Sequence, residues 1–385
     1  MSRRRRVVIL GSSGSIGESA LKVARDVPER MEVVGLAANR STAKMLAQIA
    51  EFQPQEIAMT DATAAAEVRG ATGKTVLEGE DGLCELATMP EADLVLIAIV
   101  GTAGLRPALA AIEAGKDIAV ASKEILVMAG ETVMAAAREH GVSVLPVDSE
   151  HNAIFQCLEG RSSEQVRRII LTASGGPFRT WPAADLAKVT LEQALKHPTW
   201  SMGAKISIDS ATLFNKGLEM IEARWLFDVE MPRVDVIVHP QSIIHSMVEF
   251  VDNSVLAQLS STDMCFPIQY AITWPERVPN RLAPLDFAAI GQLTFEPPRR
   301  DVFPAIDLAR WAGEVGGTLP AVLNAANEIA VAAFLERRCG FPAIWQTVER
   351  VMRSHSVTVH ASLEEILAAD AWARRKAAEQ LGVSG

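Results

Sequence analysis

Strand-like and helix-like segments alternate along the first 147 residues, and this alternation predicts an α/β protein whose N-terminal part is a doubly wound sheet. Two further observations extend the prediction. Beyond residue 148 the chain becomes rich in loops that carry Gly, Ser, His, Trp and Lys between strands, which predicts a central α/β domain with a flexible lid loop. Beyond residue 304 the hydrophobic positions recur with helical spacing, which predicts a C-terminal α-helical bundle.

The composition is that of a globular protein with more than one hydrophobic core, since 49% of its 385 residues are hydrophobic and 22% are charged. The formal net charge of −10 disfavours a nucleic acid or an anionic membrane as partner, because both bind basic surfaces. The four cysteines, Cys84, Cys157, Cys265 and Cys339, form no C-x-x-C pair, so neither a zinc cluster nor a disulfide framework is indicated. A reducing cytoplasm fits this pattern.

The N-terminus and the apolar runs favour a soluble, unprocessed protein. Arg3 to Arg6 precede only four apolar residues, Val7 to Leu10, too few for the hydrophobic region of a signal peptide. The longest clean apolar run, Leu94 to Val100, has the length of a strand and is too short to span a bilayer. We therefore expect a cytoplasmic protein.

The first strand of the predicted sheet ends in a glycine-rich turn. Val7 to Leu10 is apolar throughout, as in a strand buried on both faces, and it leads through Gly11, Gly14 and Gly17 into a helix over Glu18–Asp26. A strand, a glycine turn and a helix in this order direct backbone N–H groups towards a phosphate, as in Rossmann-like dinucleotide-binding domains. The G-x-x-G-x-x-G spacing is not the usual fingerprint, so a tight turn in another α/β protein is the alternative.

The second strand, Met31–Ala37, indicates which dinucleotide is bound. It is followed by Asn39, Arg40 and Ser41, where an NAD-binding domain usually places an acid for the ribose 2′-hydroxyl. Arg40 and Ser41 suit a 2′-phosphate instead, so NADP is favoured over NAD. The alternative is an ordinary solvated loop arginine.

Later strands bring polar residues to the edge where open α/β sheets bind ligands. The expected strands and helices of this region are Leu94–Val100, a helix from Pro107 to Gly115, Ile118–Val120, a helix over Ile125–His140, and Ser143–Val147. The polar residues that follow these strands are Ser122, Lys123, Glu124 and Asp148.

Asp148 and Glu150 stand two residues apart at the end of a strand. If the chain stays extended, both carboxylates point to one face, and Glu219 supplies a third from a predicted helix over Ala211–Phe227. That helix places Asn215 and Glu219 one turn apart. Three carboxylates suit Mg²⁺ or Mn²⁺, although spacing alone leaves solvated acids as the more common alternative.

Several donors of the kind that hold a phosphate monoester surround a Gly-Gly turn in the central part of the chain. They are Ser174, Ser210, Asn215 and Lys216, with Gly175 and Gly176 between strand and lid loop. His197 in the lid loop is a candidate for orienting a substrate, and Lys123 for acid–base chemistry or charge stabilisation. Singly, each phosphate donor is more often a turn or cap residue, and a lone lysine such as Lys123 is more often a surface ion-pair partner. For His197, an exposed loop histidine is the alternative.

The remaining segments complete a four-part organisation: residues 1–148, 149–274, a proline-rich linker over 275–304, and 305–385. The expected strands of the second part are Arg168–Thr172, Val234–Val238, Met247–Phe250 and Val255–Leu259, with a short helix over Leu191–Lys196 in the lid loop. The expected helices of the last part are Ala305–Glu314, Pro320–Leu335, Ala343–Ser354 and Leu363–Leu381.

Eight motifs, in order along nearly the whole chain, resemble the 1-deoxy-D-xylulose 5-phosphate reductoisomerase family. They are Gly11-Ser12-Ser13-Gly14-Ser15-Ile16-Gly17, Val147-Asp148-Ser149-Glu150-His151-Asn152-Ala153-Ile154-Phe155-Gln156, Ser174-Gly175-Gly176-Pro177-Phe178, His197-Pro198-Thr199-Trp200-Ser201-Met202-Gly203, Asp209-Ser210-Ala211-Thr212, Asn215-Lys216-Gly217-Leu218-Glu219, His239-Pro240-Gln241-Ser242 and Leu323-Asn324-Ala325-Ala326-Asn327-Glu328.

The resemblance implies a homodimeric, NADPH-dependent enzyme that uses Mg²⁺ or Mn²⁺, with Co²⁺ as a further choice, to rearrange and reduce 1-deoxy-D-xylulose 5-phosphate to 2-C-methyl-D-erythritol 4-phosphate in isoprenoid precursor biosynthesis. It implies an NADPH-binding first domain and a catalytic second domain. Retro-aldol cleavage and re-addition would give an aldehyde that takes hydride from the nicotinamide.

Carried over motif by motif, the resemblance assigns roles to single residues. The implied metal ligands are Asp148, Glu150 and Glu219. The implied substrate-binding residues are Lys123, Ser149, Glu150, Ser174, His197, Ser210, Asn215, Lys216 and Glu219, with Lys123, Glu150 and His197 as catalytic residues. The implied NADPH contacts are Ser13, Gly14, Ser15, Ile16, Asn39, Arg40, Ser41, Ser122, Glu124 and Gly203, where Glu124 also borders the substrate.

Three positions depart from the family pattern: Ser13 where Thr is frequent, Ser122 where Asn is frequent, and Cys265 where Arg is frequent. Two other functions compete with the one implied. Another NADP-dependent oxidoreductase, acting on a small phosphorylated or aldehyde substrate in the manner of a semialdehyde dehydrogenase, would need a nucleophilic cysteine in an electropositive pocket. A non-catalytic NADP-binding sensor would not need the three acids.

Overall fold

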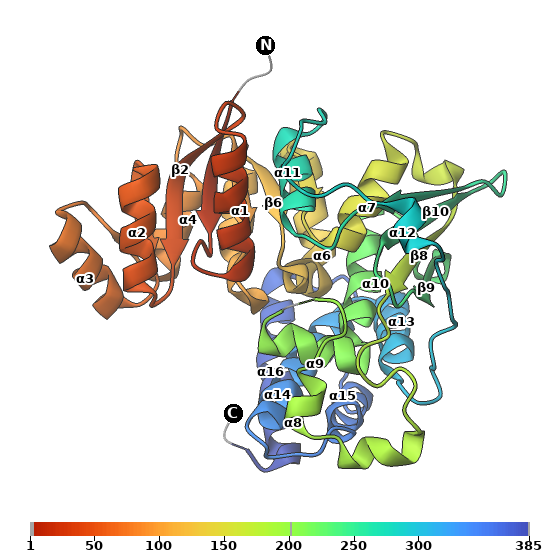
Figure 1. The fold of residues 1–385 in the computed structure, drawn as a ribbon. Helices are drawn as coiled ribbons and strands as arrows, with labels where there is room; N and C mark the ends of the chain where they lie inside the picture. Colours follow the sequence, from red (N-terminus) through yellow and green to blue (C-terminus); the bar gives the residue numbers. More distant parts are fainter. Residues whose placement is uncertain (1–3, 201, 384–385) are drawn as a thin grey trace. The chain divides into compact units, whose positions relative to one another are not determined.

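The structure, a computed structural model, describes residues 4–200 and 202–383, and it forms two compact units (Figure 1). The first unit comprises Met1–Ile125, Glu131–Asn152 and Asp263–Pro284, and the second comprises Leu126–Gly130, Ala153–Thr262 and Leu285–Gly385. Helices α6 (Lys123–His140) and α7 (Ser149–Leu158) contribute residues to both units. Residue 201, part of the predicted lid loop, lies outside the described residues.

The first unit is built on a seven-stranded sheet in which every neighbouring pair is parallel. The strands are β1 (Arg5–Leu10), β2 (Met31–Ala38), β3 (Glu56–Met59), β4 (Leu77–Glu78), β5 (Leu94–Ile97), β6 (Asp117–Val120) and β7 (Val144–Pro146). Their order is β4-β3-β2-β1-β5-β6-β7, so the winding reverses between β1 and β5. This confirms the predicted Rossmann-like sheet, and the reversal point is where such sheets bind ligands.

Helices connect the parallel strands, as the crossover geometry requires. Those of the first unit are α1 (Ser15–Asp26), α2 (Thr42–Phe52), α3 (Ala62–Thr72), α4 (Gly79–Ala87), the 3₁₀ helix η1 (Gly101–Gly104), α5 (Leu105–Glu113), the outer parts of α6, and α11 (Cys265–Thr273). The predicted strand Leu94–Val100 is shorter than expected, because pairing stops at Ile97. The elements over residues 42–87 and α11 were not predicted.

The four strands predicted for the second part form a second sheet, as expected; it is mixed and has the order β11-β10-β8-β9. Its strands are β8 (Val166–Ala173), β9 (Val234–Val238), β10 (Ile244–Phe250) and β11 (Val255–Leu259). β10 is antiparallel to β8 and β11, and β8 is parallel to β9. Within the predicted linker, Glu296 forms a bridge with Val238 at the end of β9, so this segment is attached to the sheet.

Helices make up the rest of the second unit. They are η2 (Ser163–Gln165), η3 (Ala183–Lys188), α8 (Leu191–Ala194), α9 (Ala204–Thr212), α10 (Phe214–Phe227), η4 (Met231–Arg233), α12 (Phe287–Ile290), α13 (Ala305–Val315), α14 (Leu319–Leu335), α15 (Ala343–Arg353) and α16 (Leu363–Leu381). The last four confirm the predicted helical bundle. The single helix predicted over Ala211–Phe227 is wrong, because Leu213 adopts a left-handed conformation (φ 65°) that separates α9 from α10.

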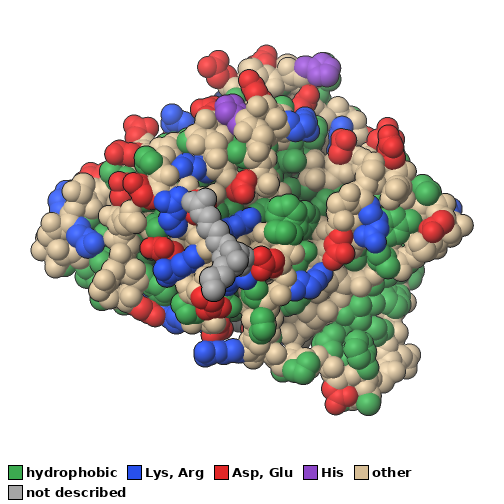
Figure 2. Space-filling model, turned by 90° about the horizontal axis from the view of Figure 1, so that it is seen from above, with side chains coloured by type: hydrophobic (Ala, Val, Ile, Leu, Met, Phe, Trp, Pro, Cys, Tyr) green, Lys and Arg blue, Asp and Glu red, His purple; other side chains and the backbone are tan. Residues whose placement is uncertain are grey.

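One hydrophobic core joins the bundle to the second sheet, with Phe178, Phe214 and Phe341 among its largest fully buried side chains. Among the described residues, no helix combines the length and the hydrophobicity that crossing a membrane requires. On the face seen in Figure 2, basic and acidic side chains are interspersed among hydrophobic and uncharged polar ones.

Candidate active site

The glycine-rich turn after β1 has the close packing that the sequence predicts. Gly11 has a φ of +96°, and a Cβ there would lie 2.5 Å from the carbonyl oxygen of Ala98. A Cβ at Gly17 would lie 2.4 Å from the carbonyl oxygen of Gly11, so neither position accepts a side chain. The Gly14 N–H donates to Gly11 (3.1 Å), and α1 begins at Ser15. The positive end of α1 therefore starts three residues earlier than predicted and lies directly behind the turn.

Two side chains of α2, those of Gln48 and Lys44, hold the glycine-rich turn in place through hydrogen bonds. The Ser12 hydroxyl donates to Gln48 (2.7 Å), and the Gln48 amide donates back to the Ser12 carbonyl (3.1 Å). Lys44 donates to the Ser13 carbonyl (3.2 Å) and pairs with Glu18 on α1 (2.5 Å), so it links α2 to the turn and to the start of α1. Lys44 was missed from the sequence, since a lone lysine three residues beyond Ser41 carries no pattern that separates it from a surface residue.

The NADPH contacts predicted after the second strand, of which Arg40 and Ser41 were assigned to the 2′-phosphate, lie at the end of β2. Asn39 accepts a hydrogen bond from the Thr60 hydroxyl (2.8 Å), and Ser41 stands at the N-cap position of α2. Arg40 forms an ion pair with Asp61 (2.9 Å), and its side chain is 80% exposed. Because the guanidinium is tethered at one nitrogen and otherwise solvated, it presents free donors at the sheet edge.

Lys123 and Asp148 form a largely buried ion pair at the ends of β6 and β7, in which the Lys123 side chain is 7% and the Asp148 side chain 12% exposed. Burial alone would raise the pKa of Asp148. The positive charge of Lys123, together with His151 and a hydrogen bond to Glu150, outweighs burial and holds the pKa of Asp148 well below its ordinary value. The Asp148 carboxylate is therefore ionised although it is buried. Beside it, the Ser122 hydroxyl donates to the Gly101 carbonyl (2.8 Å) and lies 3.2 Å from a Glu124 oxygen.

The expectation that Asp148 and Glu150 share one face of an extended segment is wrong. The backbone carbonyl of Asp148 accepts the Asn152 N–H (2.8 Å), so Asp148 is the N-cap of α7 and Glu150 lies in its first turn. A helix forms here because Asp is a favoured N-cap and because Ala153, Ile154 and Cys157 are buried at helical spacing. The Glu150 N–H donates to the Asp148 carboxylate (3.4 Å) and the Ser149 hydroxyl donates to Glu150 (2.6 Å), so Asp148 and Glu150 still occupy one turn.

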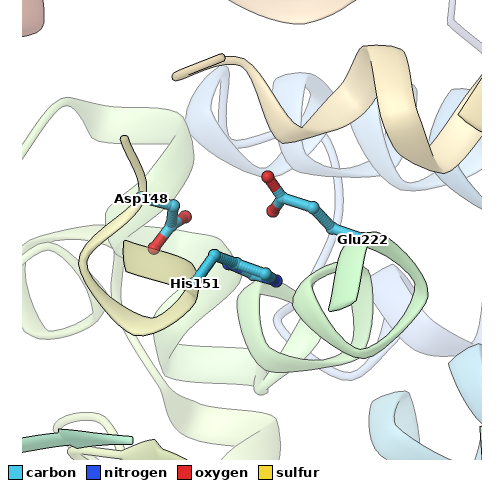
Figure 3. Close-up of side chains that lie close together, drawn as sticks. All are labelled: Asp148, His151 and Glu222. Carbon is cyan, nitrogen blue, oxygen red and sulfur yellow. The ribbon is translucent and has the colours of Figure 1, made fainter. Parts of the chain in front are cut away.

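Figure 3 shows Asp148 and His151 on the turn that opens α7, and Glu222 on α10. His151 and Glu222 are fully buried and carry atoms of the kinds that bind divalent ions. Neither was predicted as a site residue. The available signal was their spacing, since His151 follows Asp148 by three residues and Glu222 follows Glu219 by three, which is one helical turn in each case.

The polar residues predicted on α10 surround one buried acid. Glu219 is fully buried; its two carboxylate oxygens accept hydrogen bonds from the side chains of Asn215 and Lys216 respectively. The one-turn spacing of Asn215 and Glu219 predicted from the sequence is confirmed. Lys216 is also buried, so the turn carries an amide, an ammonium and a carboxylate in mutual contact.

Ser174 and His197 lie together beside the Gly-Gly turn. The N–H groups of Trp200 (2.9 Å) and Thr199 (3.3 Å) donate to Nδ1 of His197, so the hydrogen of the neutral ring is on Nε2. Burial lowers the pKa of His197 to about 4, which keeps the ring neutral at physiological pH. Nε2 lies 2.9 Å from the Ser174 oxygen, which also accepts the Gly176 N–H (3.2 Å). With both of these donors directed at its oxygen, the Ser174 hydroxyl proton is available to a ligand.

Three more contacts arrange the second unit around this turn. A Cβ at Gly176 would lie 2.8 Å from the carbonyl oxygen of Ser210, so the Gly-Gly turn packs directly against α9. The Thr199 hydroxyl lies 3.3 Å from that of Ser242, and the ring of Trp200 lies 6.3 Å from that of His245. Ser174, His197 and Ser210 are thus collected on neighbouring segments, although 36 positions separate the first from the last.

Models of one family match most of the chain. The model described as 1-deoxy-D-xylulose 5-phosphate reductoisomerase matches residues 7–130, and two models of C-terminal domains of the same enzyme match residues 144–227 and 259–376. A protein of this name from Anaeromyxobacter dehalogenans is 55% identical over 98% of this chain and 97% of its own. One from Chlorobium chlorochromatii is 56% identical over 96% and 98%.

Solved structures agree with this assignment. The Zymomonas mobilis 1-deoxy-D-xylulose 5-phosphate reductoisomerase in complex with NADPH superposes with a TM-score of 0.92 at 45% identity, over 98% of this chain and 99% of that one. A DOX-P reductoisomerase in complex with NADPH, fosmidomycin and magnesium gives 0.91 at 39% identity, over 98% of both chains. This chain belongs to the 1-deoxy-D-xylulose 5-phosphate reductoisomerase family.

Proposed function

We propose that this protein catalyses the NADPH- and divalent-metal-dependent conversion of 1-deoxy-D-xylulose 5-phosphate to 2-C-methyl-D-erythritol 4-phosphate. The observation that carries the proposal is the similarity, over nearly the whole length of both chains, to proteins that bear this enzyme's name. The fold agrees, because the first unit is a dinucleotide-type sheet whose glycine turn lies at its winding reversal.

NADPH is bound in this proposal by the first unit. Ser13, Gly14, Ser15 and Ile16 contact the pyrophosphate at the start of α1, where the helix dipole favours an anion. Arg40 and Ser41 bind the 2′-phosphate and Asn39 contacts NADPH beside them; the exposed guanidinium of Arg40 has the charge and the free donors for a phosphate. Ser122, Glu124 and Gly203 are the remaining proposed contacts.

The metal, Mg²⁺ or Mn²⁺, is proposed to bind Asp148, Glu150 and Glu219. These side chains fit a hard divalent ion because all three offer carboxylate oxygens, because Lys123 keeps Asp148 ionised, and because the buried Glu219 carboxylate is already stabilised by polar and positive partners, Asn215 and Lys216. When bound, such an ion polarises the carbonyl and the neighbouring hydroxyl of the substrate. Lys123 adds a positive charge at Asp148 and stabilises negative charge that develops on the substrate oxygens.

The phosphate end of the substrate is proposed to bind in the second unit. The free proton of the Ser174 hydroxyl donates to a phosphate oxygen, and Ser210, Asn215 and Lys216 supply further donors. Neutral His197 orients Ser174 through its Nε2–H and is well placed to contact a substrate hydroxyl. Glu150, supported by the hydroxyl of Ser149, is our first choice for the base that removes the substrate hydroxyl proton.

We further propose a cytoplasmic homodimer, organised as an NADPH-binding domain (1–148), a catalytic domain (149–274), a linker (275–304) and a helical domain (305–385). The described cysteines form no disulfide, which suits a reducing compartment. Light scattering coupled to size-exclusion chromatography checks the dimer, and a monomer at micromolar concentration would refute it.

The chemistry of the cysteines disfavours a semialdehyde-dehydrogenase-type reaction. Burial raises the pKa of Cys265 to about 12, and burial also raises those of Cys84 and Cys339, whereas a nucleophilic cysteine needs a lowered pKa.

The experiment that tests the proposed function is identification of the product. After incubation with 1-deoxy-D-xylulose 5-phosphate, NADPH and Mg²⁺, NMR should show 2-C-methyl-D-erythritol 4-phosphate. A merely reduced, unrearranged sugar phosphate would refute the proposal.

A further inference from the structure

Two asparagines on α14 are buried more completely than polar side chains usually are. Asn324 and Asn327 are both 0% exposed, on a helix whose other buried residues are almost all apolar. Burying an amide costs about 1–3 kcal/mol unless hydrogen bonds replace its water. They belong to the motif Leu323-Asn324-Ala325-Ala326-Asn327-Glu328, to which the proposed reaction assigns no task.

Asn327 holds an acid on a distant helix. Its side-chain N–H donates to Oδ1 of Asp209 (2.8 Å), which lies on α9 and is 1% exposed. The other oxygen of this carboxylate, Oδ2, pairs with the ammonium of Lys205 (2.9 Å), one turn earlier on α9. Each oxygen of Asp209 therefore has its own donor, which fixes the rotation of the carboxylate and ties α9 to α14.

α9 carries the proposed phosphate contacts at its C-terminal end. Ser210 directly follows Asp209, and the left-handed Leu213 connects α9 to Asn215 and Lys216 at the start of α10. The carbonyl of Ser210 is also the atom against which Gly176 packs. A shift of α9 by a fraction of an ångström would thus change the distance between Ser210 and the Ser174–His197 pair.

α14 is also anchored to α16. Glu328 pairs with Arg374 of α16 (2.8 Å), which also binds Asp370 (2.7 Å). Asn324 donates to Glu328 within α14 itself (3.0 Å) and makes no part of the link between the helices. Burial would lower the pKa of Arg374, but these two acids outweigh burial and raise it, so the cation stays charged. α14 contacts both α16 and α9, and Figure 1 shows the three helices in one region of the second unit. α14 is therefore a fixed support for α9.

We propose that Asn327 and Asp209 are positioning residues that set the geometry of the phosphate-binding segments through α9. The inference rests on the proposed function, because it concerns recognition of the phosphate of that same substrate.

The test compares Asn327→Leu and Asp209→Asn with a matched control, Asn324→Leu. The control removes an equally buried amide from the same helix but not the bond to α9. For Asn327→Leu we expect KM for 1-deoxy-D-xylulose 5-phosphate to rise about tenfold, because a displaced Ser210 would lose roughly one charge-assisted hydrogen bond to the phosphate. kcat and KM for NADPH should stay within about twofold, and activity on unphosphorylated 1-deoxy-D-xylulose should not change. Asp209→Asn keeps the size of the side chain and should raise the same KM severalfold, which decides the matter if Asn327→Leu does not fold.

The outcomes separate this inference from the proposed function. If wild-type protein oxidises no NADPH with the phosphorylated substrate and Mg²⁺, the proposed function fails. If wild-type is active but the two variants change KM no more than Asn324→Leu does, or lose activity on both sugars in parallel, α9 positioning is refuted and the asparagines serve stability alone.

Discussion

Ser174 and His197 form a hydrogen-bonded pair 2.9 Å apart in which the ring nitrogen is the donor, because two backbone N–H groups occupy the other ring nitrogen. Charging the ring would put a proton on Nδ1, where it would face those two N–H groups. The pair therefore depends on His197 remaining neutral.

The first prediction concerns the pH dependence of this pair. Burial lowers the pKa of His197 to about 4, so the unfolded chain binds its proton more readily and the fold loses stability as the pH falls from about 6.5 to 4. In ¹⁵N NMR spectra, His197 should keep the signals of a neutral ring with hydrogen on Nε2 down to about pH 5. His197→Ala identifies the resonances. A titration midpoint near 6.5 would contradict this assignment.

The second prediction concerns Glu150. Glu150→Gln keeps the shape of the side chain but removes the charge of the proposed base and metal ligand, so turnover should fall by about 10³-fold or more. NADPH binding, followed by fluorescence titration, should be unchanged because the cofactor contacts lie elsewhere. Glu80→Gln, which removes an exposed glutamate paired with Arg106, is the control and should be fully active. Undiminished activity of Glu150→Gln would refute both proposed roles.

The third prediction concerns cofactor choice. Arg40→Ala should reduce the preference for NADPH over NADH by about tenfold or more, as expected for a lost charge-assisted contact to the 2′-phosphate. kcat/KM for both cofactors is the measurement. Arg69→Ala is a matched control, since Arg69 is also partly exposed and paired with an acid, Glu78, in the same unit. An unchanged preference in Arg40→Ala would reject the 2′-phosphate assignment.

The fourth prediction concerns the Gly-Gly turn. Gly176→Ala places a Cβ 2.8 Å from the Ser210 carbonyl and should raise KM for the phosphorylated substrate at least tenfold, because it separates Ser174 from α9. Gly160→Ala is the control: Gly160 also has a positive φ (+78°), but nothing lies within 4 Å of its Cβ position. Both variants bear the backbone cost of about 1 kcal/mol. Equal effects on KM would contradict the proposed packing role.

The fold was largely predictable because its signals are local. Val7–Leu10 is apolar at every position, and Gly11 and Gly17 are required by backbone approaches of about 2.5 Å that no other residue tolerates. The bundle helices were found because their buried positions recur at helical spacing. The elements over residues 42–87 were not assigned.

The errors arose at short stretches where the residue pattern does not reveal that the backbone changes, either from a strand to a helix or from one helix to the next. The segment Asp148-Ser149-Glu150 follows a strand, yet Asp148 caps a helix, and the apolar positions that reveal this helix lie further on, at Ala153, Ile154 and Cys157. Likewise, Leu213 is an apolar residue within a helical pattern. Leucine rarely adopts a left-handed conformation, so the residue pattern gave no indication that the helix is interrupted there. Partners such as Asp209 and Asn327 are 118 residues apart, so their contact is a property of packing alone.

The most direct test of the proposed function follows NADPH absorbance with purified protein and 1-deoxy-D-xylulose 5-phosphate, before and after removal of divalent ions with a chelator. We predict oxidation of NADPH that requires the sugar phosphate, stops on chelation and returns with added Mg²⁺ or Mn²⁺. Absence of oxidation in the presence of metal, or oxidation that chelation leaves unchanged, would contradict the assignment of a metal-dependent reductoisomerase.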